Sequence, residues 1–384
     1  MARSDAAESV QGDRQAALDA LHADVAAHNM FPFWAVTQEV AHDEIVQLKE
    51  TQKAIPFIWK YGRDIEPLLY RSAELITTES SERRSLILVN PGLKPRRASV
   101  STMYTAYRLN DPNEIMPPHR HSPNAIRFGL TGKLNFTGVE GENIAFGPGD
   151  MVLTPHDTWH NHGNQGDEPA INLSVLDLPL VEVLNATYFE HDYREEEGGE
   201  KVRKVVQAAR FPSDYSQRVY GQGGLMPRFL SHDRGTGNAS PMYVYRWAAM
   251  RELLERFKDW DGDPHEALSI EYLDPTNGQP VFKTMTFFAQ MLRPGERTRP
   301  MKQNASLLCA PIEGSGHSLV EGTRLDWARF DTFAVPGGSW CEHINGSDSE
   351  PAVLFVASDE PTLKALALYQ KHGKTADGEV VRLV

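Results

Sequence analysis

Two short segments of the chain each carry a pair of histidines two residues apart. His119 and His121 lie in the sequence PPHRHSPNAIRFGLTG, and His160 and His162 lie in GDMVLTPHDTWHNHGN. On an extended segment, residues two apart point to the same face, so each pair presents both imidazoles to one side. Three neutral imidazoles that converge inside a small barrel can hold a divalent first-row metal and leave coordination positions open. The alternative is that these are surface or core histidines without a ligand role; the paired spacing favours the metal site.

The segments around these histidines have the composition of β-strands. From about Arg84 onward, short runs rich in Val, Ile, Leu, Phe and Thr are separated by turn-forming Gly, Pro, Asn and Asp residues. Such spacing predicts a sandwich or barrel of antiparallel strands. A second strand-rich region covers about residues 269–357 and follows a predicted helix over residues 248–257.

The remaining segments are predicted to be helices or connecting loops. Residues 16–27 and 41–53 have helical composition with Pro32 between them, and we interpret this N-terminal region as an arm or packing layer. The charged stretch 193–203 and the Gly/Ser-rich stretch 231–240 are predicted to be connecting loops.

The two strand-rich regions resemble one another in sequence. Residues 102–114 align with residues 284–296 at an offset of 182, with the matches Thr102/Thr284, Met103/Met285, Pro112/Pro294, Glu114/Glu296 and, further on, Gly132/Gly314. An offset of 181 continues the alignment through the matches Asp150/Asp331, Pro155/Pro336, Trp159/Trp340, His162/His343 and Asn164/Asn345. The order and the near-constant offset favour a duplicated β-unit over the alternative of a chance match.

The second unit has lost the histidine set. The positions that match His119, His121 and His160 are occupied by Met301, Gln303 and Cys341, and only His343 remains. A thioether, an amide and a thiol do not replace three imidazoles as ligands of such a metal. We therefore expect a metal in the first unit alone, with the second unit serving packing and oligomerisation.

The composition argues against a nucleic-acid-binding protein, a membrane protein and a disulfide-rich protein. The 384 residues include 39 Lys and Arg against 52 Asp and Glu, a formal net charge of −13 that argues against a nucleic-acid-binding surface. No run of 18 apolar residues occurs and the N-terminus lacks the apolar stretch of a signal peptide, so we expect a cytoplasmic protein without a membrane segment. The two cysteines are too few for a disulfide scaffold or a thiolate metal site.

The histidine segments resemble the two cupin motifs. The second motif, G-x5-P-x-G-x2-H-x3-N, is matched by Gly149, Pro155, His160 and Asn164, with Asp157 in place of its last Gly. The first motif is represented by His119, His121 and the closing Gly132, but its Glu is absent, because Ala125, Ile126 and Arg127 occupy that region. Oxalate decarboxylases and germins use this Glu as a fourth ligand, whereas a three-histidine site resembles ring-cleaving dioxygenases.

A closer resemblance, spanning about residues 82–357, is to the bicupin gentisate 1,2-dioxygenase family, which includes salicylate 1,2-dioxygenase and 1-hydroxy-2-naphthoate dioxygenase. It rests on the sequences ERRSLILVNPGL, PPHRHSPNAIRF, TPHDTWHNHGN and LDLPLVEVLNA. The resemblance implies a mainly β bicupin fold of two double-stranded β-helix (jelly-roll) barrels with an N-terminal helical arm. It also implies one Fe(II) per chain and a homotetramer that uses O2 to cleave an aromatic hydroxy acid between its hydroxylated and carboxylated carbons.

The same resemblance divides the chain into five parts. Residues 1–82 would form the helical arm, residues 83–192 the metal-binding cupin and residues 193–268 a linker with a helix. Residues 269–360 would form the second cupin without a metal, and residues 361–384 a C-terminal segment.

The family's site residues carry over onto matching positions. His119, His121 and His160 would be the iron ligands. Arg127 shares the odd parity of His119 and His121, so on an unbroken strand it faces the same cavity, where its fork of donors suits a carboxylate. Arg83 matches a second family arginine, with adjacent Arg84 as the fallback and a solvated surface charge as the alternative for Arg83.

Other positions line the expected pocket. His162 would hydrogen-bond the substrate or oxygen, or else support the neighbouring ligands. Tyr104 and Ala106 match pocket-lining positions, although an aromatic residue at 104 is also explained by core packing. His156 shares the parity of His160 but lies in a turn, and we interpret it as non-ligating.

One departure from the family concerns the substrate. Many gentisate enzymes have an Asp that acts on the second hydroxyl of the ring, and the matching residue here is Ser174, which cannot act as a carboxylate base at neutral pH. Asp177 lies close by in sequence but has the opposite parity. Ser174 therefore favours a salicylate, a hydroxynaphthoate or another ortho-hydroxy acid over gentisate itself.

The leading hypothesis is thus an Fe(II)-dependent ring-cleaving dioxygenase of aromatic catabolism. Two alternatives remain open: a metal-dependent cupin isomerase or decarboxylase, and a non-enzymatic ligand-binding bicupin. The missing Glu weakens the first alternative and the intact histidine set weakens the second.

Overall fold

The computed structural model describes residues 2–30, 54–76, 84–230, 234 and 237–384. It divides the chain into two compact units, Met1–Thr51 and Gln52–Val384. In the first unit the described element is helix α1 (Ala2–Ala27), which contains the expected helix over residues 16–27 and begins well before it. The expected helix over residues 41–53 lies outside the described residues.

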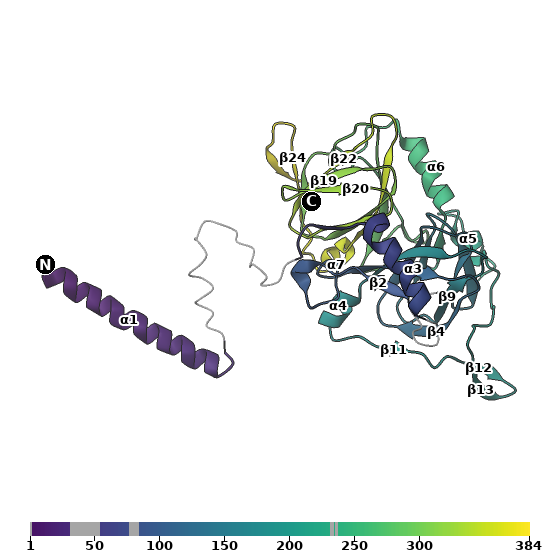
Figure 1. Ribbon diagram of the computed structural model, residues 1–384, viewed down its shortest axis with the longest axis horizontal. Coiled ribbons are helices and arrows are strands. Elements are labelled where there is room, and N and C mark those ends of the chain that lie inside the picture. The colour runs from purple at the N-terminus through teal and green to yellow at the C-terminus, as the bar shows by residue number, and fades with distance from the viewer. Residues whose placement is uncertain (1, 31–53, 77–83, 231–233, 235–236) are drawn as a thin grey trace. The chain divides into compact units, whose positions relative to one another are not determined.

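The larger compact unit, Gln52–Val384, contains two β-barrels, each made of two facing sheets (Figure 1). In the first barrel the strand orders are β14-β8-β5-β10-β3-β2 and β11-β4-β9-β6-β7. The bounds of these strands are β2 (Ser85–Ile87), β3 (Tyr104–Asn110), β4 (Ile115–His121), β5 (Ala125–Gly129), β6 (Asn135–Val139), β7 (Glu142–Phe146), β8 (Met151–Thr154), β9 (His160–Asn164), β10 (Ala170–Leu176), β11 (Phe189–Glu190) and β14 (Val244–Tyr245).

The second barrel has the orders β1-β21-β18-β23-β16-β15 and β20-β19-β22-β17-β24-β25. Its strands are β1 (Phe57–Trp59), β15 (Leu268–Glu271), β16 (Thr286–Leu292), β17 (Met301–Gln303), β18 (Leu307–Glu313), β19 (Gly316–Val320), β20 (Thr323–Trp327), β21 (Thr332–Val335), β22 (Trp340–Asn345), β23 (Ala352–Ser358), β24 (Lys371–Lys374) and β25 (Val380–Arg382). The expected pair of barrels is therefore confirmed.

Short helices connect or flank the strands. Their bounds are η1 (Tyr61–Ile65), α3 (Glu66–Leu75), η2 (Pro91–Leu93), α4 (Leu178–Val183), α5 (Tyr215–Tyr220), α6 (Trp247–Phe257) and α7 (Glu360–Ala365). Helix α6 confirms the helix expected over residues 248–257. Helices α4 and α7 occupy matching places after the last long strand of each barrel, and each has a proline, Pro179 or Pro361, in its first turn, where the missing N–H costs nothing.

The duplication seen in the sequence is also present in the structure. Strands β3, β5 and β10 reappear as β16, β18 and β23, and the glycines matched at the offset of 182 have the same backbone conformation. Gly132 and Gly314 have φ values of 72° and 74°, and a Cβ atom at either position would collide with Ala170 or Ala352. Glycine is required at both turns because this left-handed conformation and the close approach both exclude a side chain.

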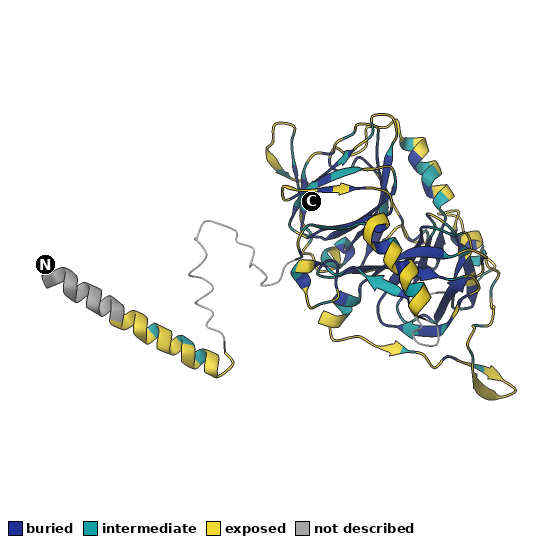
Figure 2. Ribbon diagram, in the orientation of Figure 1, coloured by how far each residue is buried: buried dark blue, intermediate teal, exposed yellow. Residues whose placement is uncertain are grey.

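Along the central strands, alternate side chains face either the core between the two barrels or the interior of their own barrel. In the central strands of the first barrel, Leu173, Val175 and Phe128 point into a core shared with the second barrel. Phe128 stacks on Phe355 of β23 with 4.1 Å between ring centroids, and the Tyr107 hydroxyl donates to the Phe330 carbonyl at 2.5 Å. The neighbouring residues of opposite parity must then point into the barrel. Figure 2 shows the strands of the two barrels as largely buried.

Two expectations about the connecting segments need correction. The stretch 193–203 was expected to be a loop, but it contains a β-hairpin of β12 (Arg194–Glu197) and β13 (Glu200–Arg203). Its turn is formed by Gly198 and Gly199, both with positive φ, the conformation that a two-residue hairpin turn requires. In addition, the segment before residue 83 is not only helical, because β1 pairs with β21 of the second barrel.

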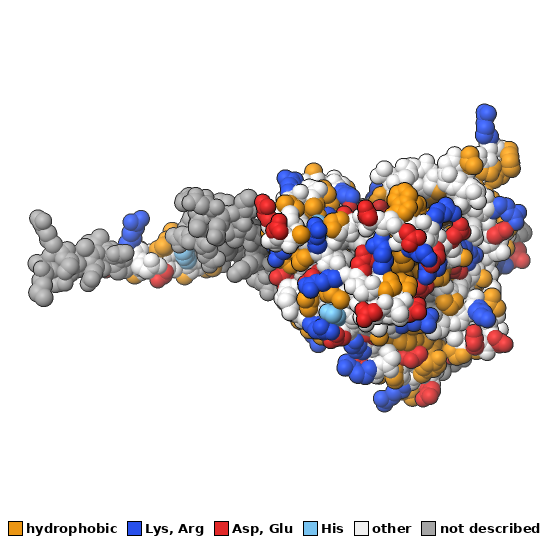
Figure 3. All heavy atoms as spheres, turned by 90° about the horizontal axis from the view of Figure 1, so that it is seen from above, with side chains coloured by type: hydrophobic (Ala, Val, Ile, Leu, Met, Phe, Trp, Pro, Cys, Tyr) orange, Lys and Arg blue, Asp and Glu red, His pale blue; other side chains and the backbone are white. Residues whose placement is uncertain are grey.

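The described surface carries charges of both signs. On the face shown in Figure 3, Lys and Arg side chains of residues 54–384 are interspersed with Asp and Glu side chains. Among the described helices, none is both long enough and apolar enough to cross a membrane.

The buried carboxyl group of Asp359 makes the stability depend on pH. Burial raises its pKa from 3.8 to about 6, against the opposing effect of hydrogen bonds from Thr102 and Ser306. The folded pKa lies above the unfolded value, so the folded state holds the Asp359 proton more tightly than the unfolded state does. The resulting contribution to the free energy of unfolding is fully present below about pH 4 and is lost as the pH rises through about 6. We expect wild type to lose roughly 2–3 kcal/mol relative to Asp359→Asn between pH 4 and 7.

Thermal or urea unfolding across this pH range measures the difference, with the exposed Asp348→Asn as the control variant. A stability difference between wild type and Asp359→Asn that does not change with pH would contradict the assignment.

Candidate metal centre

The two histidine pairs lie on adjacent antiparallel strands of the smaller sheet of the first barrel. His119 and His121 end β4, His160 and His162 begin and continue β9, and His119 is paired directly with His160. The register shifts between Met116 and His119, where the two intervening prolines lack the N–H that a regular ladder needs.

Three of these histidines converge inside the barrel. The ligand atoms of His119, His121 and His160 all lie within 4.8 Å of one another, and the side chains are at most 1% exposed. The ring centroids are 4.3 Å apart for His119 and His160 and 4.7 Å apart for His121 and His160. Within the described part of the chain, no other three His, Cys, Asp or Glu side chains bring their ligand atoms this close.

The backbone fixes which ring nitrogen faces the centre. Each Nδ1 atom lies near a carbonyl oxygen two residues away: Pro117 for His119 (3.3 Å), Pro123 for His121 (2.8 Å) and Thr158 for His160 (2.8 Å). A carbonyl only accepts, so Nδ1 carries the proton and the Nε2 lone pair is directed to the centre. Three neutral imidazoles oriented in this way fit a divalent first-row metal.

His162 has a different environment. Its Nε2 lies 3.2 Å from Nη2 of Arg127, which can only donate, and its Nδ1 lies 3.0 Å from the Thr137 hydroxyl. Burial lowers the pKa of His162 well below its usual value, and the positive charge of Arg127 acts in the same direction. His162 is therefore neutral, and its Nε2 lone pair is directed to Arg127.

A row of inward-facing residues crosses the larger sheet opposite the histidines. Ala106 on β3, Ser174 on β10 and Arg127 on β5 are directly paired with one another in register, so their side chains share one face. All three are buried, and the bond from Arg127 to His162 joins this sheet to the smaller one. The parity argument assumed an unbroken strand, and this premise is wrong, because β4 ends at His121 and β5 begins at Ala125 in the other sheet. Arg127 nevertheless lies beside the histidines, through its bond to His162.

Tyr104 lies one row closer to the start of β3. It packs with Ala106, Ala125 and Leu176 in a small apolar cluster and is 9% exposed. This packing fits both interpretations of Tyr104, as a pocket wall and as a core residue.

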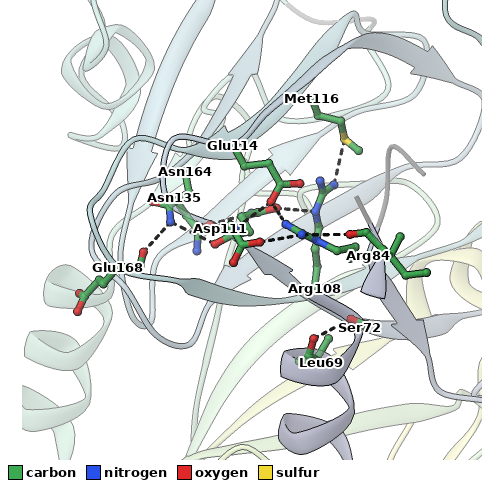
Figure 4. Close-up of polar contacts among 12 residues, drawn as sticks. Leu69, Ser72, Arg84, Arg108, Asp111, Glu114, Met116, Asn135, Asn164 and Glu168 are labelled. Carbon is green, nitrogen blue, oxygen red and sulfur yellow. Dashed lines mark hydrogen bonds and ion pairs between the residues drawn. The ribbon is translucent and has the colours of Figure 1, made fainter. Parts of the chain in front are cut away.

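The two arginines at the start of the barrel differ in what the structure describes. Arg83 lies outside the described residues. Arg84 is buried and forms ion pairs with Glu114 and with Asp111, the latter at 2.7 Å (Figure 4). Because two carboxylates already bind this guanidinium, Arg84 is a poor substitute for Arg83 in binding a substrate anion.

Asp177 and His156 also have structural partners. The Asp177 carboxylate accepts hydrogen bonds from Asn124 and Thr284 and does not replace an acid at Ser174. The His156 Nδ1 lies 2.6 Å from the Ser122 carbonyl, and this histidine is not part of the convergent group, as expected.

Several side chains near the centre were not anticipated from the sequence. Arg108, the next inward-facing residue of β3, is buried beside Met116, with 3.1 Å between Nη1 and Sδ (Figure 4). Strand β11 brings Phe189 against His121, with ring centroids 5.5 Å apart, and brings His191 to 5.9 Å from His119. Alternation along β3, which also turns Ala106 inward, predicts an inward Arg108, whereas nothing in the sequence near residue 189 indicates pairing with β4.

The matching centre of the second barrel is an apolar core. Cys341 Sγ and His343 Nε2 are 3.8 Å apart, and Cys309, which matches Arg127, belongs to a cluster with Leu307, Phe333 and Val356. Burial raises the pKa of Cys341 and lowers that of His343 to about 4, so both groups are neutral. That this barrel holds no metal stays a prediction.

Comparisons with known proteins agree with this geometry. A cupin-domain family model matches residues 110–176, which contain both histidine pairs. A 5-aminosalicylate 1,2-dioxygenase from a Comamonas species is 34% identical over 95% of this chain and 92% of its own length. Gentisate 1,2-dioxygenase 1 from Aquipseudomonas alcaligenes is 33% identical over 90% of this chain and 93% of its own. The crystal structure of salicylate 1,2-dioxygenase from Pseudaminobacter salicylatoxidans superposes with a TM-score of 0.77 at 28% identity and covers 93% of this chain and 97% of that one.

Removing one imidazole should abolish metal binding. We expect His160→Ala to lose almost all of the divalent metal that the wild type binds at this centre, because two imidazoles cannot replace the third donor. Elemental analysis after anaerobic loading and desalting measures this, and circular dichroism tests the fold.

The control is His317→Ala, which removes a partly buried imidazole of the second barrel that is not in the convergent group and should keep its metal. Full metal content in His160→Ala would show that the centre has been placed wrongly.

Proposed function

Because the chain belongs to the gentisate 1,2-dioxygenase family of ring-cleaving dioxygenases, we propose that His119, His121 and His160 hold one Fe(II) ion. At this ion the protein opens the ring of an ortho-hydroxy aromatic carboxylic acid with O2. The observation that carries the proposal is the convergence of three buried imidazoles whose Nδ1 atoms are all anchored on backbone carbonyls.

The donor set suits iron and an anionic substrate. When bound, Fe(II) supplies redox chemistry toward O2 and open positions for a chelating phenolate and carboxylate. Three neutral ligands leave the charge of a divalent ion uncompensated, so the chelating anion also neutralises the site. We extend the proposal to one ion per chain, because the matching residues of the second barrel are a neutral thiol, a thioether and an amide.

Arg127 is proposed to bind the substrate carboxylate. Its guanidinium lies in the row of Ala106 and Ser174, across the barrel from the histidines. The neutral His162 accepts one of its N–H bonds and so fixes the plane of the fork. A charge-assisted bond of this kind in a buried site is worth roughly 2–5 kcal/mol. Arg83 remains part of the proposal as a second carboxylate ligand.

The wall around the ring is partly apolar and partly polar. Tyr104, Ala106 and Leu176 would contact the ring and exclude water from it. Ser174, beside Arg127, has a neutral hydroxyl at the position where many gentisate enzymes have an Asp. Unlike that Asp, it cannot act as a carboxylate base toward a second ring hydroxyl. We propose a salicylate with or without a neutral 5-substituent as the preferred substrate; the related Comamonas enzyme is named for 5-aminosalicylate.

Oxygen consumption across a substrate panel tests the function. We expect the Fe(II)-loaded protein to consume one O2 for each salicylate-type molecule and to form a product with ring-opened absorbance. The panel should contain salicylate, gentisate, 5-aminosalicylate and 1-hydroxy-2-naphthoate, with His160→Ala as the inactive control.

If no member of the panel consumes oxygen, the proposal fails. Turnover without oxygen on a Mn- or Zn-loaded protein would favour the isomerase or decarboxylase alternative, and binding without turnover would favour the non-enzymatic one.

Ser174 should control the response to a second ring hydroxyl. We expect Ser174→Asp to raise the ratio of kcat/KM for gentisate over salicylate by about tenfold, equivalent to about 1.4 kcal/mol, because a carboxylate can accept a proton from the 5-hydroxyl. Steady-state kinetics on both substrates measures the ratio at equal iron content.

Ser174→Asn is the control, since it has the size of Asp without its charge. Equal ratios in the Asp and Asn variants would mean that Ser174 acts through volume alone or not at all.

A further inference from the structure

Two matching hydrogen-bonded clamps join the barrels. Asp177, at the end of β10, accepts a bond from the Thr284 hydroxyl at 2.5 Å, and Thr284 precedes β16 of the second barrel. In the reverse direction Asp359, at the end of β23, accepts a bond from the Thr102 hydroxyl at 2.5 Å, and Thr102 precedes β3 of the first barrel. The two clamps are related by the offset of 182 that relates the barrels.

The first clamp continues into the loop that follows a proposed metal ligand. Asp177 also accepts from the backbone N–H of Asn124 at 2.8 Å and from its side-chain amide at 3.0 Å. The same amide nitrogen lies 3.2 Å from the Thr284 hydroxyl, so Thr284, Asp177 and Asn124 form a closed triangle of contacts.

Asn124 in turn fixes the loop around His121. Its Oδ1 accepts the backbone N–H of His156 at 2.9 Å, and the His156 ring lies 2.6 Å from the Ser122 carbonyl. The carbonyl of Pro123, directly before Asn124, lies 2.8 Å from Nδ1 of His121. The orientation of the His121 ring therefore depends on a carbonyl whose position is set by Asn124.

This chain of contacts is buried and polar. Asp177 is 1% exposed and Asn124 is 8% exposed. Burial raises the pKa of Asp177, and the bonds from Thr284 and Asn124 act in the opposite direction. Removing the threonine hydroxyl would leave a buried carboxylate with one donor fewer, and the cost of that loss favours rearrangement of its remaining partner, Asn124.

We propose that Thr284, a residue of the metal-free barrel, is a positioning residue for the metal centre of the other barrel. It acts through Asp177 and Asn124 on the Pro123 carbonyl, and through that carbonyl on His121. The second barrel then contributes to metal binding without holding a metal. This inference rests on the proposed three-histidine centre.

The second clamp provides a matched control. Asp359 accepts the backbone N–H of Ser306 at 2.7 Å, and the Ser306 hydroxyl accepts the N–H of Gly337 at 3.2 Å, as Asn124 does for His156. This clamp fixes the loop after Gln303, which matches His121 but is no part of the convergent histidine group. Thr102→Val therefore breaks an equivalent contact between the barrels without reaching the metal loop.

Co(II) affinity and its visible spectrum provide the test, because Co(II) reports ligand geometry without turnover. Affinity is measured by chelator competition on the full-length wild type and on Thr284→Val, Thr284→Ser and Thr102→Val, with unfolding temperatures for each. We expect Thr284→Val to bind Co(II) roughly three- to tenfold more weakly with an altered spectrum. The effect should be smaller than the 10–100-fold loss for a direct partner of a ligand, because Thr284 acts two hydrogen bonds further away.

Thr284→Ser keeps the hydroxyl and should restore wild-type affinity and spectrum, and Thr102→Val should bind like wild type despite a similar loss of stability. If Thr284→Val does not fold, Asn124→Ser, which copies Ser306, removes the amide bonds instead and should also weaken binding. Wild-type affinity and spectrum in Thr284→Val, or equal losses in Thr284→Val and Thr102→Val, would overturn the inference. If wild type itself binds no Co(II), the proposed centre is wrong and the inference falls with it.

Discussion

The site depends on the alternation of side chains along three central strands, β3, β10 and β5. Their registers are fixed, so Leu173, Val175 and Phe128 lie in the core between the barrels while Ser174 and Arg127 must face the interior of the first barrel. A shift of one residue would place a charged guanidinium in that apolar core. Packing between the barrels therefore fixes which positions of these strands face the barrel interior.

The second barrel shows that packing between the barrels does not determine which residue types face the barrel interior. In both barrels the face toward the shared core is apolar, with Phe128 stacked on Phe355. The inward faces differ, because Arg127 and Ser174 are matched by Cys309 and Val356 in the second barrel, which lie in an apolar cluster. The hydrogen bond between Thr137 and His162 has a counterpart in the second barrel, between Ser318 and His343. This supporting contact is therefore present in both barrels, although the second barrel lacks the three histidines.

Local spacing predicted much of the centre, and contacts between distant segments were the main omission. The HxH pairs and the repeat offset are visible over a few residues or as one constant shift. The parity assigned to Arg127 assumed a strand that the structure breaks between β4 and β5. By contrast, the approach of Phe189 and His191 and the contacts of Thr284 with Asp177 join segments separated by about 70 to 110 residues, and no local pattern encodes them. The hairpin over residues 194–203 was missed because its charged composition suggested a loop, although the Gly-Gly turn was a usable signal.

An acidic chain with a net charge of −13 can bind an anionic aromatic acid only if positive charge is concentrated locally. Neutral imidazole ligands keep more positive charge at the site than a carboxylate ligand would, because they do not compensate the charge of the metal that attracts the substrate anion. X-ray absorption at the iron edge of the Fe(II)-loaded protein tests this central claim directly. We expect one iron per chain with three imidazole nitrogens and no sulfur. A sulfur ligand, which would place the metal at Cys341 or Met301, or two irons per chain would contradict this assignment.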